Sequence, residues 1–347
     1  MSLRQERPAR RLPRPRGRRP AVAGGAADCA VRGTRLRFSR PGEAPATRLR
    51  VTQDRRHPSA ARASRRATAD PNVFLIPAEH LPPGFAEQVD DPALTPAVPR
   101  PAATVVLLRD AEGGPEALLL RRHRRSGFAA GAWVFPGGMV EAGDRDPALA
   151  ERLDGPTPAE WARRLELADM GEALGYVAAA VREAFEETGI LLARPDGVAS
   201  PHDRAHRLEV ARRALLNDVV GLHDVAVGNG LTLAGDELLY IAHWITPEPE
   251  PRRYDTRFFA ARAPAGAVCD LHDQELTDAA WLRPEQAVER FRAGEMKLLP
   301  PTVHTLENLA RYRSFDELRT ALAEAPVRTI LPHMRRDPGG VAIVVPE

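Results

Sequence analysis

Cysteine and long apolar runs are both scarce in this chain. Its 347 residues include two cysteines, Cys29 and Cys269, which are too few for a disulfide scaffold or a cysteine-rich zinc site. The longest stretch without a charged side chain is Ser126–Val140, whose 15 residues are interrupted by glycine and proline. A membrane-spanning helix needs about 20 consecutive apolar residues. We therefore expect no membrane segment, a reducing compartment and a cytoplasmic location.

Acidic residues are almost missing from the first 66 positions, which hold 19 arginines and four acids. This part carries a charge of +15, whereas the other 281 residues carry −13. It is rich in Arg, Pro, Ala and Gly and has no apolar period, so it cannot bury enough surface to offset the entropy of ordering. We expect residues 1–68 to be disordered, either as a basic arm or as an extension without function. The acidic body argues against nucleic-acid binding.

Apolar residues become periodic from Pro71 onward, and their spacing predicts strands and helices. The expected strands are Ala103–Arg109, Glu116–Arg122, Trp133–Phe135, Leu238–Thr246, Thr256–Arg262, Thr277–Leu282 and, as a strand or tail, Val341–Val345. The expected helices are one opened by the capping box Thr157–Glu160, then Gly171–Thr188, Pro201–Asn217, Pro284–Ala293, Pro301–Tyr312 and Ser314–Glu324. Because the two kinds of element do not alternate strictly, we expect an α/β fold with a mixed sheet covered by helices.

The helix expected at Gly171–Thr188 carries three carboxylates within one turn. With about 100° per residue, Glu183, Glu186 and Glu187 fall in one sector. Their mutual repulsion can be relieved by solvent or by a divalent cation with oxygen ligands. Arg182 stands four residues before Glu186 and can pair with it. A solvated glutamate-rich helix face is the alternative explanation of this pattern.

A glycine turn and another acid lie upstream of this helix. Gly137 and Gly138 follow Phe135-Pro136 and let the backbone approach a ligand closely. Asp144 comes six residues after Gly138. A glycine turn, an acid and a glutamate helix together suit Mg²⁺, which takes oxygen ligands and bridges carboxylates to substrate phosphates. The pattern therefore predicts a site for a metal ion and a phosphorylated substrate.

The two halves together resemble the Nudix box, written G-x5-E-x7-R-E-U-x-E-E-x-G-U, where U is a bulky apolar residue. Gly138-x5-Asp144 matches the first half with Asp where Glu is usual. Arg182–Ile190 matches the second half, with the small Ala184 where a bulky apolar residue is usual. The spacer between Asp144 and Arg182 is 37 residues instead of 7. Such an insertion is a feature of the coenzyme A diphosphatase-like branch of the Nudix family. The chain also resembles that branch at Gly127–Gly138, Asp255–Phe259, Trp281–Pro284 and Leu299–Thr302.

The resemblance implies a Nudix fold, in which a mixed β-sheet is sandwiched between helices, with extra helices at the C-terminal end. We expect the Nudix domain at residues 69–312, with an insertion at 145–181 inside the box. A C-terminal helix and tail would follow at 313–347. The apolar residues Trp161, Leu165 and Leu167 of the insertion could cover an acyl or pantetheine chain or pack on the core.

The resemblance also implies roles for individual residues, with Mg²⁺ or Mn²⁺ as the cofactor. The expected metal ligands are Glu183, Glu186, Glu187, the Gly137 carbonyl and Asp144. Arg182 would orient Glu186 rather than touch the substrate. The general base is open between Glu183 and Glu275, an acid in the loop before the Trp281 strand. Glu275 could equally be an ordinary solvated loop residue.

Nudix enzymes hydrolyse a nucleoside diphosphate linked to another moiety, so the expected partner is a small nucleotide-diphosphate substrate. We expect coenzyme A or acyl-coenzyme A, cut to 3′,5′-ADP and (acyl-)4′-phosphopantetheine. The expected substrate-binding residues are Arg121, Arg122, Arg124, Arg125 and Gly138. The arginines would hold phosphates such as the 3′-phosphate, or they form a solvated basic loop. ADP-ribose, NADH and dinucleoside polyphosphates are alternative substrates, and a ligand-sensing regulator with a Nudix fold is the non-enzymatic alternative. The oligomeric state is left open, a homodimer included.

Overall fold

The computed structural model describes residues 70–124, 129–197, 201–271 and 276–346. The arm expected at residues 1–68, together with Arg125 and Glu275, therefore lies outside the described residues. None of the described helices combines the length and the apolar character that crossing a membrane requires.

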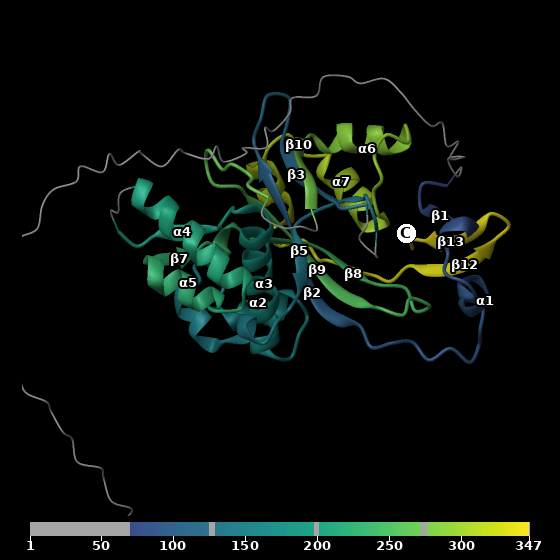
Figure 1. Cartoon of the computed structure of the whole chain (residues 1–347), viewed down its shortest axis with the longest axis horizontal. Coiled ribbons are helices and arrows are strands. Elements are labelled where there is room, and N and C mark those ends of the chain that lie inside the picture. Colours follow the sequence, from purple (N-terminus) through teal and green to yellow (C-terminus); the bar gives the residue numbers. More distant parts are fainter. Residues whose placement is uncertain (1–69, 125–128, 198–200, 272–275, 347) are drawn as a thin grey trace, which may run out of the picture. The chain divides into compact units, whose positions relative to one another are not determined.

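Eight of the described strands form a mixed sheet at the centre of the fold (Figure 1). The strands are β2 (Arg100–Arg109), β3 (Glu116–Arg122), β4 (Trp133–Val134), β5 (Gly137–Met139), β8 (Leu239–Ile245), β9 (Tyr254–Arg262), β10 (Leu276–Leu282) and β11 (Thr329–Ile330). The order is β10–β3–β2–β9–β8–β11, with β4 paired to β3 and β5 paired to β2. β2 runs parallel to β9 and β8 runs parallel to β11, whereas the other pairs are antiparallel. The expectation of a mixed sheet is confirmed.

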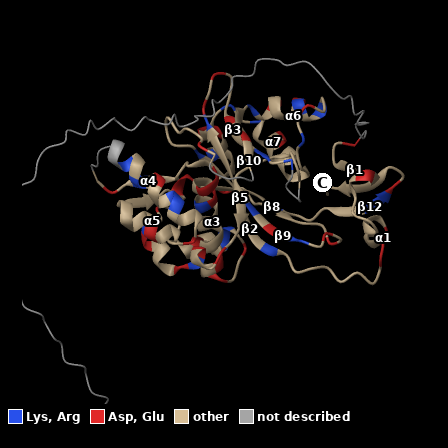
Figure 2. Cartoon of the chain, viewed as in Figure 1, with Lys and Arg blue, Asp and Glu red and all other residues tan. Residues whose placement is uncertain are grey.

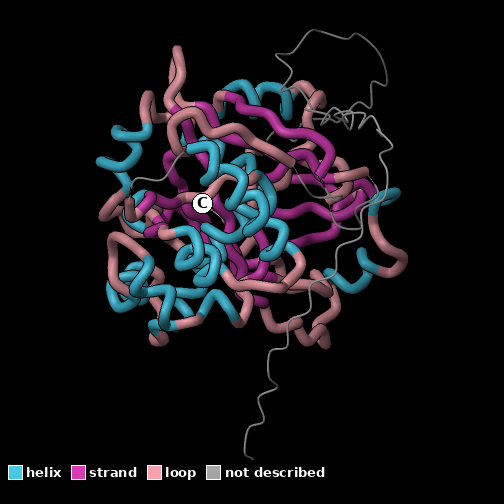
Figure 3. Tube along the Cα trace, turned by 60° about the vertical axis from the view of Figure 1, so that its left-hand side comes forward, coloured by secondary structure: helices cyan, strands magenta, loops and turns pink. Residues whose placement is uncertain are grey.

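Helices cover both faces of this sheet, because successive side chains of a strand point to opposite sides. Val105 and Leu107 of β2 pack with one group of helices, and Val106 and Leu108 pack with the other. The first group is α2 (Pro158–Arg164), α3 (Met170–Thr188), α4 (Pro201–Leu216) and α5 (Leu222–Asn229). The second group is α6 (Pro284–Arg292), α7 (Pro300–Leu309) and α8 (Phe315–Leu322). Figures 1 and 3 show the strands between these helices, so the predicted fold class is confirmed.

The long helix α3 is defined at both ends by its own sequence. The side chain of Asp169 accepts a hydrogen bond from the Glu172 N–H over 2.8 Å and caps the first turn. Gly189 ends the helix with a φ of 72°, a left-handed conformation that favours glycine. Between these ends, the small and aliphatic side chains are buried against the sheet. This burial holds α3 across the face of β2.

The insertion at residues 145–181 is folded into the domain. It contains a 3₁₀ turn, α2 and the first two-thirds of α3. α2 opens with the predicted capping box: Thr157 N–H donates to Glu160 over 2.7 Å, and Glu160 N–H donates to the Thr157 hydroxyl over 3.3 Å. Trp161 is fully buried, with its ring edge-on to Phe259 at 5.8 Å, and Leu165 is buried beside it. These side chains therefore pack on the core and do not cover a substrate.

The end of the chain contains more strands than the sequence predicted. A second sheet has the order β1–β13–β12, formed by Val73–Pro77, Gly340–Val344 and His333–Asp337. Its central strand β13 pairs with β1 on one side and β12 on the other. The elements α1 (Phe85–Val89), α5, β6 (Ala193–Pro195) and β7 (Leu231–Leu233) were also not predicted. They are short, and their apolar periods are too brief to stand out from loops.

Candidate active site

The glycine strand β5 lies directly against α3. Within the sheet, Gly138 stands opposite Ala103 of β2. A Cβ on Gly138 would collide with the carboxylate of Glu183. A Cβ on Gly137 would lie 2.5 Å from the Ala103 carbonyl oxygen. The Gly137 N–H also donates to Oε2 of Glu187 over 3.2 Å. The absence of a side chain at Gly138 therefore lets Glu183 approach the strand backbone, whereas its absence at Gly137 lets β5 lie close to β2.

Arg182 connects the parts of the site, because all five of its guanidinium N–H groups donate hydrogen bonds. Nε and Nη2 donate to the two oxygens of Asp144, each over 2.9 Å. Nη1 donates to Oε1 of Glu183 and to Oε2 of Glu186, again over 2.9 Å. Nη2 also donates to the Met139 carbonyl oxygen over 2.9 Å. Arg182 therefore joins the acid, the glutamate helix and the glycine strand, while its part in catalysis stays a prediction.

Asp144 is only 1% exposed. Both of its oxygens accept from Arg182, and Oδ2 also accepts from the Glu141 N–H over 2.8 Å. In this arrangement the carboxylate is used to hold the guanidinium. Its role as a metal ligand stays a prediction.

Acidic and basic residues lie together around α3 and β5 (Figure 2). Four carboxylates, those of Asp144, Glu183, Glu186 and Glu187, lie around β5 and the end of α3, against the guanidinium groups of Arg182 and Arg212. Burial raises the pKa of Glu183 to about 7 against the opposing charge of Arg182, and the neighbouring Glu186 adds to the rise. Burial raises the pKa of Glu186 in the same way. One more cation would relieve this excess of negative charge.

The carboxylates suit a hard divalent cation by chemistry and by charge. As the described side chains stand, no three of the His, Cys, Asp and Glu residues form a group that could hold a metal ion. Arg182 engages the carboxylates of Glu183 and Glu186 instead. Each of these carboxylates accepts from Arg182 through one oxygen, Oε1 of Glu183 and Oε2 of Glu186, so the other oxygen is the one that could face Mg²⁺ or Mn²⁺. Metal binding by Glu183, Glu186, Glu187, Gly137 and Asp144 stays a prediction.

The arginines predicted to bind phosphate do not share one face of the sheet. The Arg121 guanidinium lies over the ring of Trp133, 5.9 Å from its centroid, on the side that α6 and α7 cover. Arg122 is the next residue of β3, so its side chain points to the face of α3. Arg124 follows the end of the strand and is exposed, and Arg125 lies outside the described residues. Of the two arginines of this set that belong to β3, Arg122 is therefore the one on the same side as the glutamates.

Of the two candidates for the general base, Glu183 belongs to the described residues and Glu275 does not. Glu183 lies against β5, and its side chain is 12% exposed. Glu275 lies outside the described residues, but Leu276, which follows it, pairs with Arg122. Leu276 also packs in the core on the face of α3. The strand register therefore places Leu276, the first residue of β10, on the side of the sheet that carries Arg122.

One residue near the site was not predicted. Arg212 of α4 is buried and donates to the backbone carbonyl of Glu186. Its neighbour Arg213 is exposed and pairs with Glu209. The spacing in the sequence could have indicated this residue. Arg212 shares a helix face with Leu215, so a charged residue interrupts the apolar stripe of this helix.

A second polar cluster lies on β8, β9 and β11 and extends to α3. His243 of β8 makes hydrogen bonds of 2.7 Å with Asp255 of β9 and with Thr329 of β11. The Arg257 guanidinium lies 3.7 Å from Asp255 and over the ring of Tyr176 of α3, 5.5 Å from its centroid. The Asp255–Phe259 likeness thus includes residues that contact the neighbouring strand β8 and the long helix.

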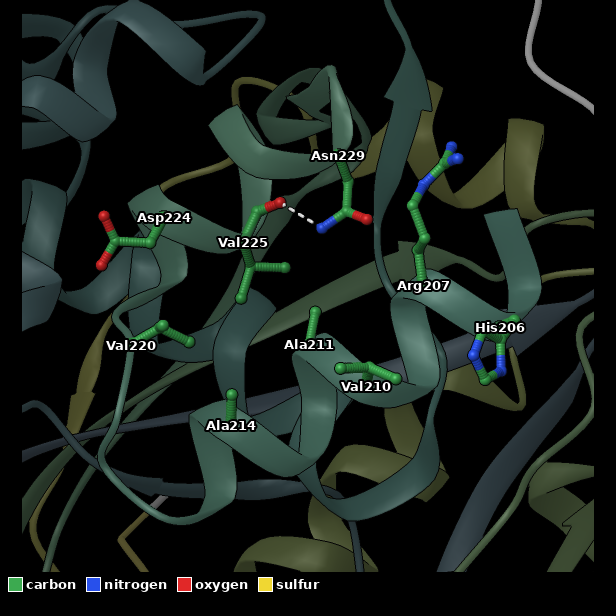
Figure 4. Close-up of a pocket in the computed structure, with 9 residues that line it drawn as sticks. All are labelled: His206, Arg207, Val210, Ala211, Ala214, Val220, Asp224, Val225 and Asn229. Atoms are coloured by element: carbon green, nitrogen blue, oxygen red, sulfur yellow. Dashed lines mark hydrogen bonds between the residues drawn. The ribbon is translucent and has the colours of Figure 1, made fainter. Parts of the chain in front are cut away.

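A cavity of about 370 Å³ lies between α4 and α5 (Figure 4). Its wall is mostly aliphatic and includes Val210, Ala211 and Ala214 of α4 and Val225 of α5. None of the predicted catalytic, metal-binding or substrate-binding residues is among the described residues that line it. The cavity is therefore distinct from the glutamate cluster.

The part of the chain that contains this site is similar to known proteins. The family model of the NUDT19 Nudix domain matches residues 99–309. Acyl-coenzyme A diphosphatase NUDT19 of Gallus gallus is 31% identical over 264 residues, which cover 63% of this chain and 70% of the chicken protein. The protein of the same name in Homo sapiens is 30% identical over 250 residues, which cover 58% of this chain and 62% of the human protein. The matched range contains both the glycine strand and the glutamate helix.

A solved structure agrees with this similarity. The crystal structure of a NUDIX hydrolase from Alicyclobacillus acidocaldarius superposes with a TM-score of 0.50 and 26% sequence identity. The match covers 67% of this chain and 99% of that chain. The mixed sheet with helices on both faces is therefore shared with a solved member of the same fold.

Proposed function

Because the chain belongs to the Nudix hydrolase family, with a Nudix domain of the NUDT19 type, we propose that it hydrolyses the diphosphate of coenzyme A or acyl-coenzyme A. The products would be 3′,5′-ADP and (acyl-)4′-phosphopantetheine. The diphosphatase class follows from the family, and the substrate is the proposed part. The chicken and human relatives, both named acyl-coenzyme A diphosphatases, support this substrate.

One observation carries the proposal: the three glutamates of one helical turn lie beside a glycine strand, and Arg182 donates to two of them. The excess of negative charge around Arg182 favours a divalent cation such as Mg²⁺ or Mn²⁺. When bound, this metal would neutralise the diphosphate and lower the pKa of the attacking water. A thioester carries no charge for such a site to neutralise. The diphosphate is therefore the part of the substrate that we expect to react.

Hydrolysis adds one water molecule across the P–O–P bridge. The water oxygen bonds to one phosphorus, and that phosphorus loses its bond to the bridging oxygen, which leaves with the other phosphate. The proton of the water passes to a base. Within the described residues the candidate is Glu183, because it lies against β5 and its pKa of about 7 suits proton transfer near neutral pH. Glu275 is the candidate outside the described residues.

Recognition of the rest of the substrate is expected to involve Arg122. Its side chain points to the same face as α3, and a guanidinium can make two parallel hydrogen bonds to a phosphate. The 3′-phosphate distinguishes coenzyme A from dephospho-coenzyme A. We propose that Arg122 binds this group, with Arg124 near the end of the same strand.

The deciding experiment is a substrate panel with the full chain in Mg²⁺ or Mn²⁺. It compares coenzyme A, acyl-coenzyme A, ADP-ribose, NADH and a dinucleoside polyphosphate, with products identified by mass in water labelled with ¹⁸O. We expect 3′,5′-ADP and phosphopantetheine, one of them carrying the label. Release of free coenzyme A from the acyl substrate would overturn the proposed reaction. Turnover of only the other nucleotides would overturn the substrate but keep the hydrolase class, and binding without turnover would indicate a sensor.

A further inference from the structure

Arg212 is buried at the C-terminal end of the helix that carries the glutamates. Its side chain is only 2% exposed, although it belongs to α4. Nε and Nη2 donate to the Glu186 carbonyl oxygen over 3.1 and 2.7 Å. Nη2 also donates to the Asp270 carbonyl oxygen over 2.8 Å. One guanidinium therefore joins α4, the last turn of α3 and the segment at Asp270.

The last turn of α3 needs such donors, because the final four carbonyl groups of an α-helix have no partner within the helix. The Phe185 carbonyl accepts from the Gly189 N–H over 2.9 Å. The Thr188 carbonyl accepts from the Asp270 N–H, also over 2.9 Å. The Glu186 carbonyl accepts from Arg212. Two of these carbonyls are therefore satisfied from outside the helix.

The positive charge of Arg212 lies at the C-terminal end of α3, where the helix carries partial negative charge. The carboxylate of Asp270 comes within 3.9 Å of Nη1, but it is 74% exposed. Burial also lowers the pKa of Arg212, which reflects the cost of removing a cation from water. The partial negative charge at the C-terminal end of α3 offsets part of this cost. Simple packing would be served better by an apolar side chain, so the two carbonyls explain why an arginine is here.

We propose that Arg212 is a positioning residue for the hydrolase: it keeps the last turn of α3 helical and thereby holds Glu186 and Glu187 in place. Helix ends fray when their terminal groups lose their partners. Glu186 and Glu187 belong to this last turn, so fraying would displace two of the three box glutamates. Arg212 itself makes no contact with the carboxylates of these residues within the described hydrogen bonds. The kinetic test rests on the proposed function, whereas the backbone test below does not.

The kinetic test compares Arg212→Met and Arg212→Lys with wild type, at a temperature where circular dichroism shows each protein folded. Arg213→Lys is the matched control, because Arg213 is exposed and pairs only with Glu209 of its own helix among the described contacts. We expect kcat to fall roughly ten- to a hundredfold in Arg212→Met, since small displacements of catalytic groups cost that much. KM should change little, because Arg212 binds backbone and not substrate. Arg212→Lys should recover part of the loss by keeping the charge at the helix end.

The backbone test measures amide hydrogen exchange without substrate. In Arg212→Lys, the amides of residues 187–190 should exchange faster than in wild type, while those of β2 stay protected. If wild type hydrolyses none of the panel substrates, the proposed function fails. The exchange measurement alone then decides the role of Arg212. Wild-type kcat in folded Arg212→Met, a loss confined to KM, or unchanged exchange at 187–190 in Arg212→Lys would each overturn the proposal.

Discussion

Asp144 and Arg182 meet through two parallel hydrogen bonds, Oδ1 to Nε and Oδ2 to Nη2, each of 2.9 Å. Thirty-seven residues separate them in the sequence, and both side chains are at least 95% buried. The insertion between them folds so that its two ends return to the same place. The halves of the Nudix box are therefore joined by a buried ion pair and not by proximity along the chain.

Asp144→Asn should destabilise the protein by about 3–5 kcal/mol, because it leaves the buried guanidinium of Arg182 without its two-point partner. Urea unfolding monitored by circular dichroism measures the loss. Glu112→Gln is the control, since it removes a carboxylate that is exposed on a turn. A loss no larger than that of the control would show that Arg182 is held by its other contacts.

Glu187→Gln should lower kcat by about 10²–10⁴-fold, because it removes one charged oxygen donor from the expected metal site. Treatment of wild type with EDTA should have an effect of similar size. Glu172→Gln, in the first turn of the same helix, is the matched control and should stay close to wild type. Activity of Glu187→Gln within a few-fold of wild type would contradict the carboxylate-metal interpretation.

The stability of the metal-free protein should increase as the pH falls from 8 to 5.5. The pKa of Glu183 is raised to about 7 in the folded protein, above the ordinary value of 4.5. The folded state therefore binds this proton more tightly, and the stabilisation is lost as the pH rises through 7. The expected change is about 2 kcal/mol. Urea unfolding in EDTA should show it in full in wild type and in Glu172→Gln, and should show a smaller change in Glu183→Gln, where the raised pKa of Glu186 remains. An identical pH dependence in all three proteins would contradict the assignment.

Arg122→Ala should reduce kcat/KM for coenzyme A by roughly ten- to a hundredfold and should have a smaller effect on dephospho-coenzyme A. The reason is the lost contact with the 3′-phosphate. Arg121→Ala is the control, because Arg121 lies over Trp133 on the opposite side of the sheet. Equal losses on both substrates would remove Arg122 from recognition of the 3′-phosphate and leave the diphosphatase reaction untouched.

A chain that starts at residue 69 should keep the melting temperature and kcat of the full chain. The reason lies in composition, since residues 1–66 carry a charge of +15 and no apolar period. Differential scanning fluorimetry and the substrate assay measure the two quantities. A large drop in either would assign a structural or catalytic role to the N-terminal segment.

The elements around the site were predictable because their signals are local. The Thr157–Glu160 pattern marks the start of α2, and Gly189 marks the end of α3. The helical spacing of Glu183, Glu186 and Glu187 places them in one turn. The box motif pointed to the Nudix family and its fold, and both are confirmed.

Contacts between distant parts of the chain could not be predicted in the same way. Arg212 reaches the backbone of Glu186 from another helix, and in the sequence it looks much like Arg213 beside it. The different directions of Arg121 and Arg122 follow from strand alternation, but only once the face covered by α3 is known. The ion pair of Asp144 and Arg182 depends on how the whole insertion folds. Each of these contacts is decided by tertiary structure.

The sheet β1–β13–β12 also sets the time at which the fold can be completed during synthesis. Val73 of β1 pairs with Val344 of β13. The first described strand therefore cannot pair until about 270 further residues have been synthesised. At 5–20 residues per second, that interval is roughly 15–55 s. During this interval β1 has been synthesised but its partner strand β13 has not. Loss of the segment from Gly340 onward would make that unpaired state permanent.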